Sequence, residues 1–211
     1  HKNLFINLIY TNRIMSSFNV HNRRIMLDVK KLMSNGYQLY FSAGSLDEIF
    51  VIFHGPEDSH YRNGIWKLRI RFPPQYPYKG PLVSFCNYIY HPNVESKAGA
   101  ICLNFLSKDW SPVHDLLSVL NEFIPDLLRN PNAGDPYNTE AARLYNKDVD
   151  EYGRMVQEHI TKFASDIQAL LPEKIEFEKN SNVLESYNIF ENEDDDDNND
   201  GNDDSGDILI I

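Results

Sequence analysis

Apolar and polar residues alternate along the chain in patterns that predict a helix, then short strands, then further helices. Residues 21–34 carry apolar side chains at helical spacing with basic residues between them, and Gly36 follows as a left-handed helix cap. We therefore expect an amphipathic helix that packs on the folded body. Its predicted core face consists of Ile25, Val29, Leu32 and Met33.

Four short segments rich in β-branched and aromatic residues come next and predict strands. In residues 65–72 every second side chain is large and apolar, which indicates one buried face. Because short turns separate the segments, consecutive strands should pair as an antiparallel meander. The predicted strands are residues 37–42, 49–53, 65–72 and 82–86.

Prolines mark two rigid loops, residues 73–81 and 130–136, because each proline removes a backbone donor. Pro125 lies inside the otherwise helical segment 116–128, where we expect a kink or a break unless tertiary contacts compensate. Helices are also predicted for residues 139–146 and 149–170, so the fold class is α+β. The predicted buried face of segment 116–128 consists of Leu117, Leu120, Ile124, Leu127 and Leu128.

The net charge of −11 comes from one end of the chain. Residues 180–211 hold eleven Asp or Glu and no Lys or Arg, which leaves twenty acidic and twenty basic residues in residues 1–179. So acidic a segment cannot bury enough apolar surface to offset its ordering entropy. We expect a disordered leader at 1–18, one folded domain at 19–171 and an acidic, largely disordered tail at 172–211.

Composition narrows the function classes. Two cysteines in 211 residues exclude a disulfide scaffold and suit a reducing compartment such as the cytoplasm or nucleus. The apolar run at residues 4–10 is far below the ~18 residues of a membrane span. A neutral body with an acidic tail argues against nucleic-acid binding. We expect no metal, no cofactor and no membrane association, and a monomer.

Residues 91–110 hold the candidate chemistry. A His-Pro-Asn turn, residues 91–93, precedes Cys102, which lies in the sequence Ile-Cys-Leu-Asn. A lone cysteine is more often a small buried hydrophobe than a nucleophile. The other motifs along the chain reverse that interpretation.

Five motifs in order resemble ubiquitin-conjugating enzymes over residues 23–164. Any one of them alone would be a weak signal, but their common order and spacing make the resemblance specific. The resemblance implies the fold of that family: an N-terminal helix, a four-stranded antiparallel meander sheet, a catalytic loop, then C-terminal helices. The motifs are Gly55-Pro56 with Tyr61 and Asn63-Gly64, the loop 73–81, His91-Pro92-Asn93 with Cys102, Trp110-Ser111-Pro112, and 131–136 followed by 139–142.

The resemblance implies an acyl transfer through Cys102. This cysteine would accept the carboxyl terminus of ubiquitin from the activating enzyme, which consumes the ATP, and hold it as a thioester for a substrate lysine. Asn93 would stabilise the oxyanion, brace the loop, or do both. Asp135 matches the acidic residue that orients the lysine and helps to remove its proton, although an Asp there is also suited to capping the next helix. His91 and Pro92 are interpreted as turn architecture.

Partner surfaces follow from the same resemblance. Glu95 is a weaker candidate for the acidic rim of the site. Leu120 and Asn121 are candidates for holding the donor ubiquitin. Ligases of the RING type would dock on Tyr78, Lys79, Ser111, Pro112 and Val113, and the activating enzyme on the exposed basic pair Arg23 and Arg24.

Departures from the common pattern point to a subgroup. Cys102 lies nine residues after Asn93, where most members have eight, and the segment 110–131 is one residue longer than usual. These insertions, Pro125 and the acidic tail resemble the H-type subgroup, which is linked with histone ubiquitination and with the multisubunit GID/CTLH ligase. Asn104 and the residues 59–62, Ser-His-Tyr-Arg, differ from the usual pattern and concern surface recognition.

Three alternatives stay open at this point. The cargo could be another ubiquitin-like modifier, which the sequence separates least well from ubiquitin. The chain could be a non-catalytic ubiquitin-binding variant, although such variants lack the cysteine. A cysteine hydrolase that pairs Cys102 with His91 fits poorly, because nothing resembles a base oriented by a third group.

Overall fold

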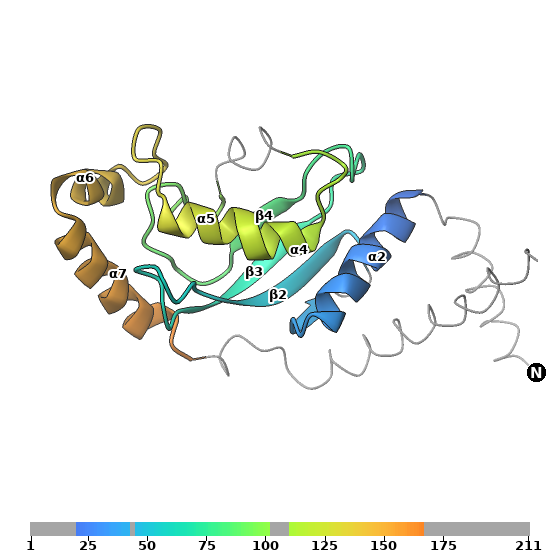
Figure 1. Cartoon of the computed structure of the whole chain (residues 1–211), viewed down its shortest axis with the longest axis horizontal. Helices are drawn as coiled ribbons and strands as arrows, with labels where there is room; N and C mark the ends of the chain where they lie inside the picture. Colours follow the sequence, from blue (N-terminus) through green and yellow to red (C-terminus); the bar gives the residue numbers. More distant parts are fainter. Residues whose placement is uncertain (1–19, 43–44, 102–109, 167–211) are drawn as a thin grey trace, which may run out of the picture. The chain divides into compact units, whose positions relative to one another are not determined.

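A computed structural model describes residues 20–42, 45–101 and 110–166. The chain divides into two compact units, His1–Pro172 and Glu173–Ile211, and every described residue belongs to the first. Cys102, the leader at 1–18 and the acidic tail at 172–211 therefore lie outside the described residues. Figure 1 follows the described elements along the chain, with α2 at one end of the sheet and α6 and α7 at the other.

The first helix, α2 (Val20–Ser34), confirms the prediction for residues 21–34. Ile25, Val29 and Leu32 are fully buried, as their helical spacing predicts. Met33 was wrongly placed on the core face, because it is 46% exposed. It follows Leu32 directly, and one residue turns the side chain about 100° around the helix axis.

Four antiparallel strands form one sheet in the order β1-β2-β3-β4, which confirms the predicted meander. Along β3 the even-numbered side chains are buried and the odd-numbered ones are not, so one face of the sheet forms the core. The fold class is α+β, as predicted. The strands are β1 (Leu39–Phe41), β2 (Glu48–His54), β3 (Ile65–Arg71) and β4 (Leu82–Phe85).

The segment after Trp110 is one continuous helical run with a wider turn in its middle. It comprises α4 (Leu116–Ser118), a π-helical turn η1 (Val119–Phe123) and α5 (Ile124–Arg129). The helical run continues past Pro125, so the predicted break is absent, and the π-helical turn is the irregularity that accompanies the proline. The backbone N–H of Ile124 donates to the carbonyl of Val119, five residues earlier, and the wider turn relieves the clash of the proline ring with the preceding turn. The wider turn changes which side chains share one face of the helical run. Leu116 is therefore buried, whereas Leu117 is only half-buried.

Helices α6 (Thr139–Lys147) and α7 (Val149–Phe163) complete the described fold. The prediction that the last helix continues to residue 170 is wrong for residues 164–166, because α7 ends at Phe163. The carbonyl of Ala164 accepts a hydrogen bond from the N–H of Ile65 at 2.8 Å, and the Asn87 side chain donates to the carbonyl of Phe163 at 3.0 Å. The sheet thus takes up carbonyls that a longer helix would have used.

A buried aromatic cluster joins the sheet to α7. Tyr61, Trp66 and Tyr152 are each at most 1% exposed, and the Tyr61 hydroxyl donates to the carbonyl of Tyr90 at 2.7 Å. Gly64 is required here, because a Cβ at that position would lie 2.1 Å from the Trp66 ring. Within the described ranges, no helix is both long enough and apolar enough to cross a membrane.

Candidate active site

The His-Pro-Asn turn is anchored to the end of α5 through a fully buried histidine. The N–H of Asn93 donates to Nδ1 of His91 at 2.9 Å, so Nδ1 is unprotonated and Nε2–H donates to the carbonyl of Leu127 at 3.0 Å. That carbonyl is free because the residue four positions later is Pro131, which has no N–H. Burial lowers the pKa of His91 to about 4 against the opposing effect of the Leu127 carbonyl, so the imidazole is neutral.

Asn93 clamps the loop that carries Asp135. Asn93 is buried, with 3% of its surface exposed, and its Oδ1 accepts the N–H of Asn132 at 2.8 Å. Its Nδ2 donates to the carbonyl of Asn132 at 2.7 Å and, over a longer 3.4 Å, to the carbonyl of Asp135. A buried amide satisfied at both ends fixes the spacing between the turn and the loop.

Pro92 adds two backbone hydrogen bonds between the turn and the segment that follows Asp135. Its carbonyl accepts the N–H groups of Tyr137 and Asn138, each at 2.9 Å. The Asn138 side chain caps α6, since its Oδ1 accepts the N–H of Ala141 at 3.1 Å. The alternative reading of Asp135 as that cap is therefore wrong. Asp135 itself is exposed, on the loop held by Asn93.

The chain returns to this turn immediately before Cys102. Ile101 pairs with Val94 in an isolated antiparallel bridge, and Val94 is the neighbour of Asn93. Gly99 has a φ of 65°, and a Cβ there would lie 1.9 Å from the carbonyl oxygen of Phe85. Only glycine permits this approach, which seats the loop on β4. Cys102 follows Ile101 in the sequence and lies outside the described residues.

Comparison with known proteins assigns the chain to a family. The family described as ubiquitin-conjugating enzyme matches residues 21–160. This chain belongs to the ubiquitin-conjugating enzyme family. It is accordingly a transferase that works through a thioester intermediate.

Individual relatives agree with that assignment. "Ubiquitin-conjugating enzyme E2 6" of Arabidopsis thaliana is 43% identical over 143 residues, which cover 68% of this chain and 78% of the relative. "Ubiquitin-conjugating enzyme E2-24 kDa" of Saccharomyces cerevisiae is 42% identical over 143 residues, covering 68% of this chain and 66% of the relative. The crystal structure of a putative ubiquitin conjugating enzyme from Plasmodium yoelii superposes with a TM-score of 0.64 at 28% identity, covering 70% of this chain and 97% of that one.

In this conjugating enzyme the other cysteine, Cys86, is exposed, but the pKa of its thiol is unfavourable for a nucleophile. Partial desolvation raises that pKa, and the nearby Lys67 and Arg69 only partly counteract the effect. A thiol with a raised pKa supplies little thiolate at neutral pH. Among the described residues, no group of three or more His, Cys, Asp or Glu side chains is arranged to hold a metal ion.

Glu95, the weaker candidate for the acidic rim, is used within its own loop. Its Oε2 accepts the N–H groups of Lys97, at 3.0 Å, and of Ala98. The hydrogen bond from Ala98, and to a smaller extent that from Lys97, lowers the pKa of the Glu95 carboxyl. The carboxyl is therefore ionised at neutral pH. Its carboxylate shapes the turn that precedes Gly99.

The five residues that the sequence predicts to bind a ligase lie on two exposed loops. Tyr78 is 76% exposed and Val113 is 90% exposed, while Lys79 and Pro112 are exposed and Ser111 is half-buried. The loops touch through the Trp110 indole N–H, which donates to the carbonyl of Pro77 at 2.7 Å. The structure therefore brings together all five residues of the predicted ligase surface on two adjoining loops.

Two of the sequence-based assignments need correction. Arg23 is exposed, but the expectation that Arg24 forms part of the same solvated pair is wrong, because its side chain is 22% exposed and fully engaged in hydrogen bonds. Leu120 is 1% exposed, so it packs in the core and presents no surface to ubiquitin. Asn121 is exposed, and its Oδ1 accepts the Tyr37 hydroxyl at 2.6 Å.

Sequence reasoning also missed residues that hold the site together. Asn132 and Asn138 supply the partners of the catalytic turn, and the sequence predicted only the rigid loop 130–136 that contains Asn132. Asp28 and Tyr76 form a buried polar pair beside the ligase surface. One signal was present in the sequence: Arg24 and Asp28 stand four residues apart, the spacing of an ion pair along a helix.

Proposed function

We propose that the chain carries ubiquitin on Cys102 and transfers it to substrate lysines with a RING-type ligase. In the loading step the Cys102 sulfur attacks the thioester of the activating enzyme, so that one carbon–sulfur bond forms as the other breaks and the activating enzyme regains its thiol. In the transfer step a lysine nitrogen attacks the same carbonyl, the carbon–nitrogen bond forms, and the Cys102 thiolate leaves.

The clamp between the His-Pro-Asn turn and residues 132–138 is the observation that carries this proposal. It holds Asn93 and Asp135 on adjoining loops, next to the point where Ile101 leads into Cys102. A transferase with a thioester intermediate needs a cysteine, and Cys86 is disfavoured by the raised pKa of its thiol. Cys102 is the other cysteine of the chain.

Asn93 would serve as both brace and oxyanion donor. Its Nδ2 makes two unequal hydrogen bonds, a 2.7 Å bond to the carbonyl of Asn132 and a 3.4 Å bond to the carbonyl of Asp135. The long bond is weak, so Nδ2 would lose little by donating instead to a developing oxyanion, with which it would form a stronger, charge-assisted bond. The short bond keeps the loop in place meanwhile.

Asp135 would act as the acidic gate for the incoming lysine. A lysine is protonated at neutral pH and must lose a proton before its nitrogen can attack. An exposed carboxylate at the rim attracts the ammonium group and accepts or relays that proton. Its freedom from capping duty, which Asn138 performs, favours this role.

The partner assignments complete the proposal. A RING-type ligase would bind the surface formed by Tyr78, Lys79, Ser111, Pro112 and Val113, and the activating enzyme would contact the exposed Arg23. The longer catalytic loop, Pro125 and the acidic segment favour the H-type subgroup, with a GID/CTLH-like ligase and basic substrates such as histones as partners. The enzyme would act as a monomer in the cytoplasm or nucleus, in protein degradation or histone modification.

A loading assay tests the central step. The purified chain is incubated with ubiquitin-activating enzyme, ATP and ubiquitin, and the products are separated with and without reductant. We expect one reductant-sensitive adduct, absent from Cys102→Ala and reductant-resistant in Cys102→Ser, where an ester replaces the thioester. Cys86→Ser is the matched control and should load like the wild type.

Each other outcome of this assay has a defined meaning. Loss of the adduct in Cys86→Ser but not in Cys102→Ala would refute the assignment of Cys102. An adduct with another ubiquitin-like modifier and its own activating enzyme, but none with ubiquitin, would change the cargo. A chain that loads normally but whose thioester no lysine discharges would refute the transfer step.

A further inference from the structure

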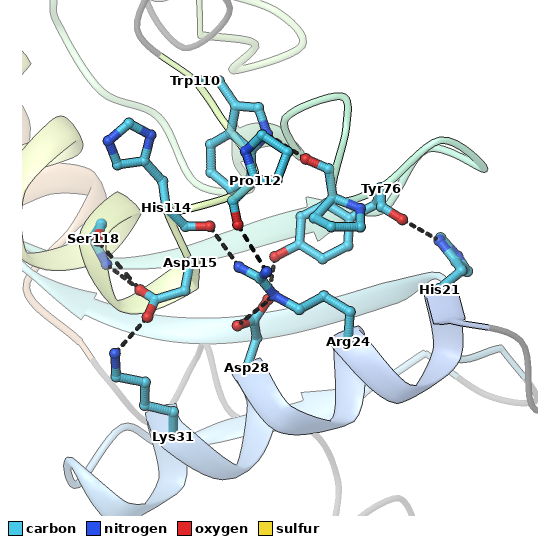
Figure 2. A network of polar contacts seen from close by, with 11 residues as sticks. His21, Arg24, Asp28, Lys31, Tyr76, Trp110, Pro112, His114, Asp115 and Ser118 are labelled. Carbon is cyan, nitrogen blue, oxygen red and sulfur yellow. Dashed lines mark hydrogen bonds and ion pairs between the residues drawn. The ribbon is translucent and has the colours of Figure 1, made fainter.

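A buried carboxylate lies at the centre of a polar network beside the ligase surface, as Figure 2 shows. Asp28 is 4% exposed, on the face of α2 that points into the fold. Both of its oxygens accept from Nε of Arg24, at 3.0 and 3.2 Å, and one also accepts the Tyr76 hydroxyl. Burial raises the pKa of the Asp28 carboxyl, and the hydrogen bond from Tyr76 and the charge of Arg24 only partly counteract this desolvation.

Arg24 extends this network to the second ligase loop. Its two terminal nitrogens donate to the carbonyls of Pro112, at 2.9 Å, and His114, at 2.6 Å. A planar guanidinium offers donors in a fixed fork, so orienting Nε toward Asp28 also aims the other two nitrogens at the loop. Figure 2 shows the Arg24 side chain between Asp28 and these carbonyls.

Tyr76 connects the same carboxylate to the first ligase loop. It lies two residues before Tyr78, is 2% exposed, and its backbone carbonyl accepts from His21 of α2 at 3.1 Å. The two loops also meet directly. Trp110 donates to the carbonyl of Pro77, and a Cβ added at Gly80 would lie 3.0 Å from its ring.

We propose that Asp28 and Tyr76 are positioning residues that hold the two loops of the ligase surface in their docking arrangement, with Arg24 as the connecting side chain. Neither residue is accessible to a partner, so each acts through its neighbours. The inference rests on the proposed function only in so far as these loops bind a ligase. Without the tyrosine–aspartate bond, the first loop keeps only its bond from His21 to α2, and without the carboxylate the guanidinium loses its orientation.

The Trp110 indole N–H reports on this arrangement independently of any ligase. We expect Tyr76→Phe and Asp28→Asn to speed its hydrogen exchange about tenfold, measured by NMR on the full chain, which corresponds to about 1.4 kcal/mol of local opening. The Trp66 indole, which donates to Tyr88 at 3.3 Å elsewhere in the fold, should exchange as in the wild type. Tyr78→Phe is the matched control, since it removes an exposed hydroxyl from the same loop.

Unchanged Trp110 exchange in both variants would overturn the inference. Equal acceleration at Trp110 and Trp66 would also overturn it, because that result indicates general destabilisation. These hydrogen-exchange measurements test the inference without any ligase.

A kinetic arm distinguishes the inference from the proposed function. The probe is whichever purified RING-type ligase discharges the wild-type thioester fastest in a panel. Tyr76→Phe should raise the KM for that ligase about fivefold, with kcat and ligase-free loading within about twofold of the wild type. Val113→Asp, which changes the ligase surface itself, should raise the KM for the ligase at least as much. If Val113→Asp has no effect, or no ligase accelerates discharge, the proposed ligase surface is refuted while Trp110 still decides the inference.

Discussion

Acidification should destabilise this fold through one buried imidazole, that of His91. Its pKa is about 4 in the folded chain against 6.5 for a solvated histidine, because burial disfavours the charged form. Between these two values the unfolded chain binds a proton that the folded chain does not. Stability from this group is therefore fully present above pH 6.5 and is lost as the pH falls towards 4.

The size of the effect follows from the two pKa values. Lowering the pH from 7 to 5 should cost about 2 kcal/mol from His91 alone, by integrating the difference in bound protons. The full shift corresponds to about 3 kcal/mol at 1.36 kcal/mol for each pKa unit. That is a large part of the ~5–15 kcal/mol that stabilises an ordinary domain.

Urea unfolding from pH 7.5 to 5.0 measures this contribution. His91→Asn should be less stable at pH 7, since it loses the bond to Leu127, but its stability should fall about 2 kcal/mol less on acidification. His54→Gln, at an exposed position, is the control and should follow the wild type. Parallel curves for the wild type and His91→Asn would refute the reasoning, as would an NMR titration of the His91 ring with a midpoint near 6.5.

Three further predictions concern the catalytic turn and the tail. Asn93→Ala should lower the free energy of unfolding by about 2–3 kcal/mol in urea, because it leaves polar groups of the Asn132 backbone without their partner; a change below about 0.5 kcal/mol would contradict the clamp. Asp135→Ala should slow discharge to free lysine by tenfold or more with thioester loading unchanged, and equal loss of both steps would contradict the gate. Deleting residues 180–211 should spare loading but weaken transfer to histones, most strongly at low salt; salt-independent transfer would leave the tail as a solubilising segment.

The parts of the fold that the sequence predicted are those with a strong local period. The core face of α2 and the alternation along β3 needed only the count of apolar positions, because one face of each element is buried against the rest. The motif order placed Asn93 and Asp135 in one site, and the structure holds them on adjoining loops. Cys102 was also predicted from its motif, and its role stays a prediction.

The parts that the sequence did not predict depend on contacts between distant segments. Nothing near Pro125 says that a wider turn, rather than a break, will accommodate it. The end of α7 is set by Ile65 and by Asn87, which lies 76 residues before the Phe163 whose carbonyl it binds. Asp28 looks like a surface charge on an amphipathic helix until Tyr76 covers it.

One of the residues that hold the catalytic turn of this enzyme, Asn93, is also proposed to take part in its chemistry. His91 ties the turn to α5, and Pro92 and Asn93 tie it to the loop of Asp135. A substitution at Asn93 therefore removes a fold contact and an oxyanion donor together, and activity alone cannot separate the two. The 3.4 Å bond offers the separation, because the chemistry needs that hydrogen and the clamp hardly does. For Asn93→Ala, the slower discharge can be expressed as an increase in activation free energy and compared with the loss in free energy of unfolding. An increase larger than that loss measures the oxyanion role, and an equal one assigns Asn93 to the fold.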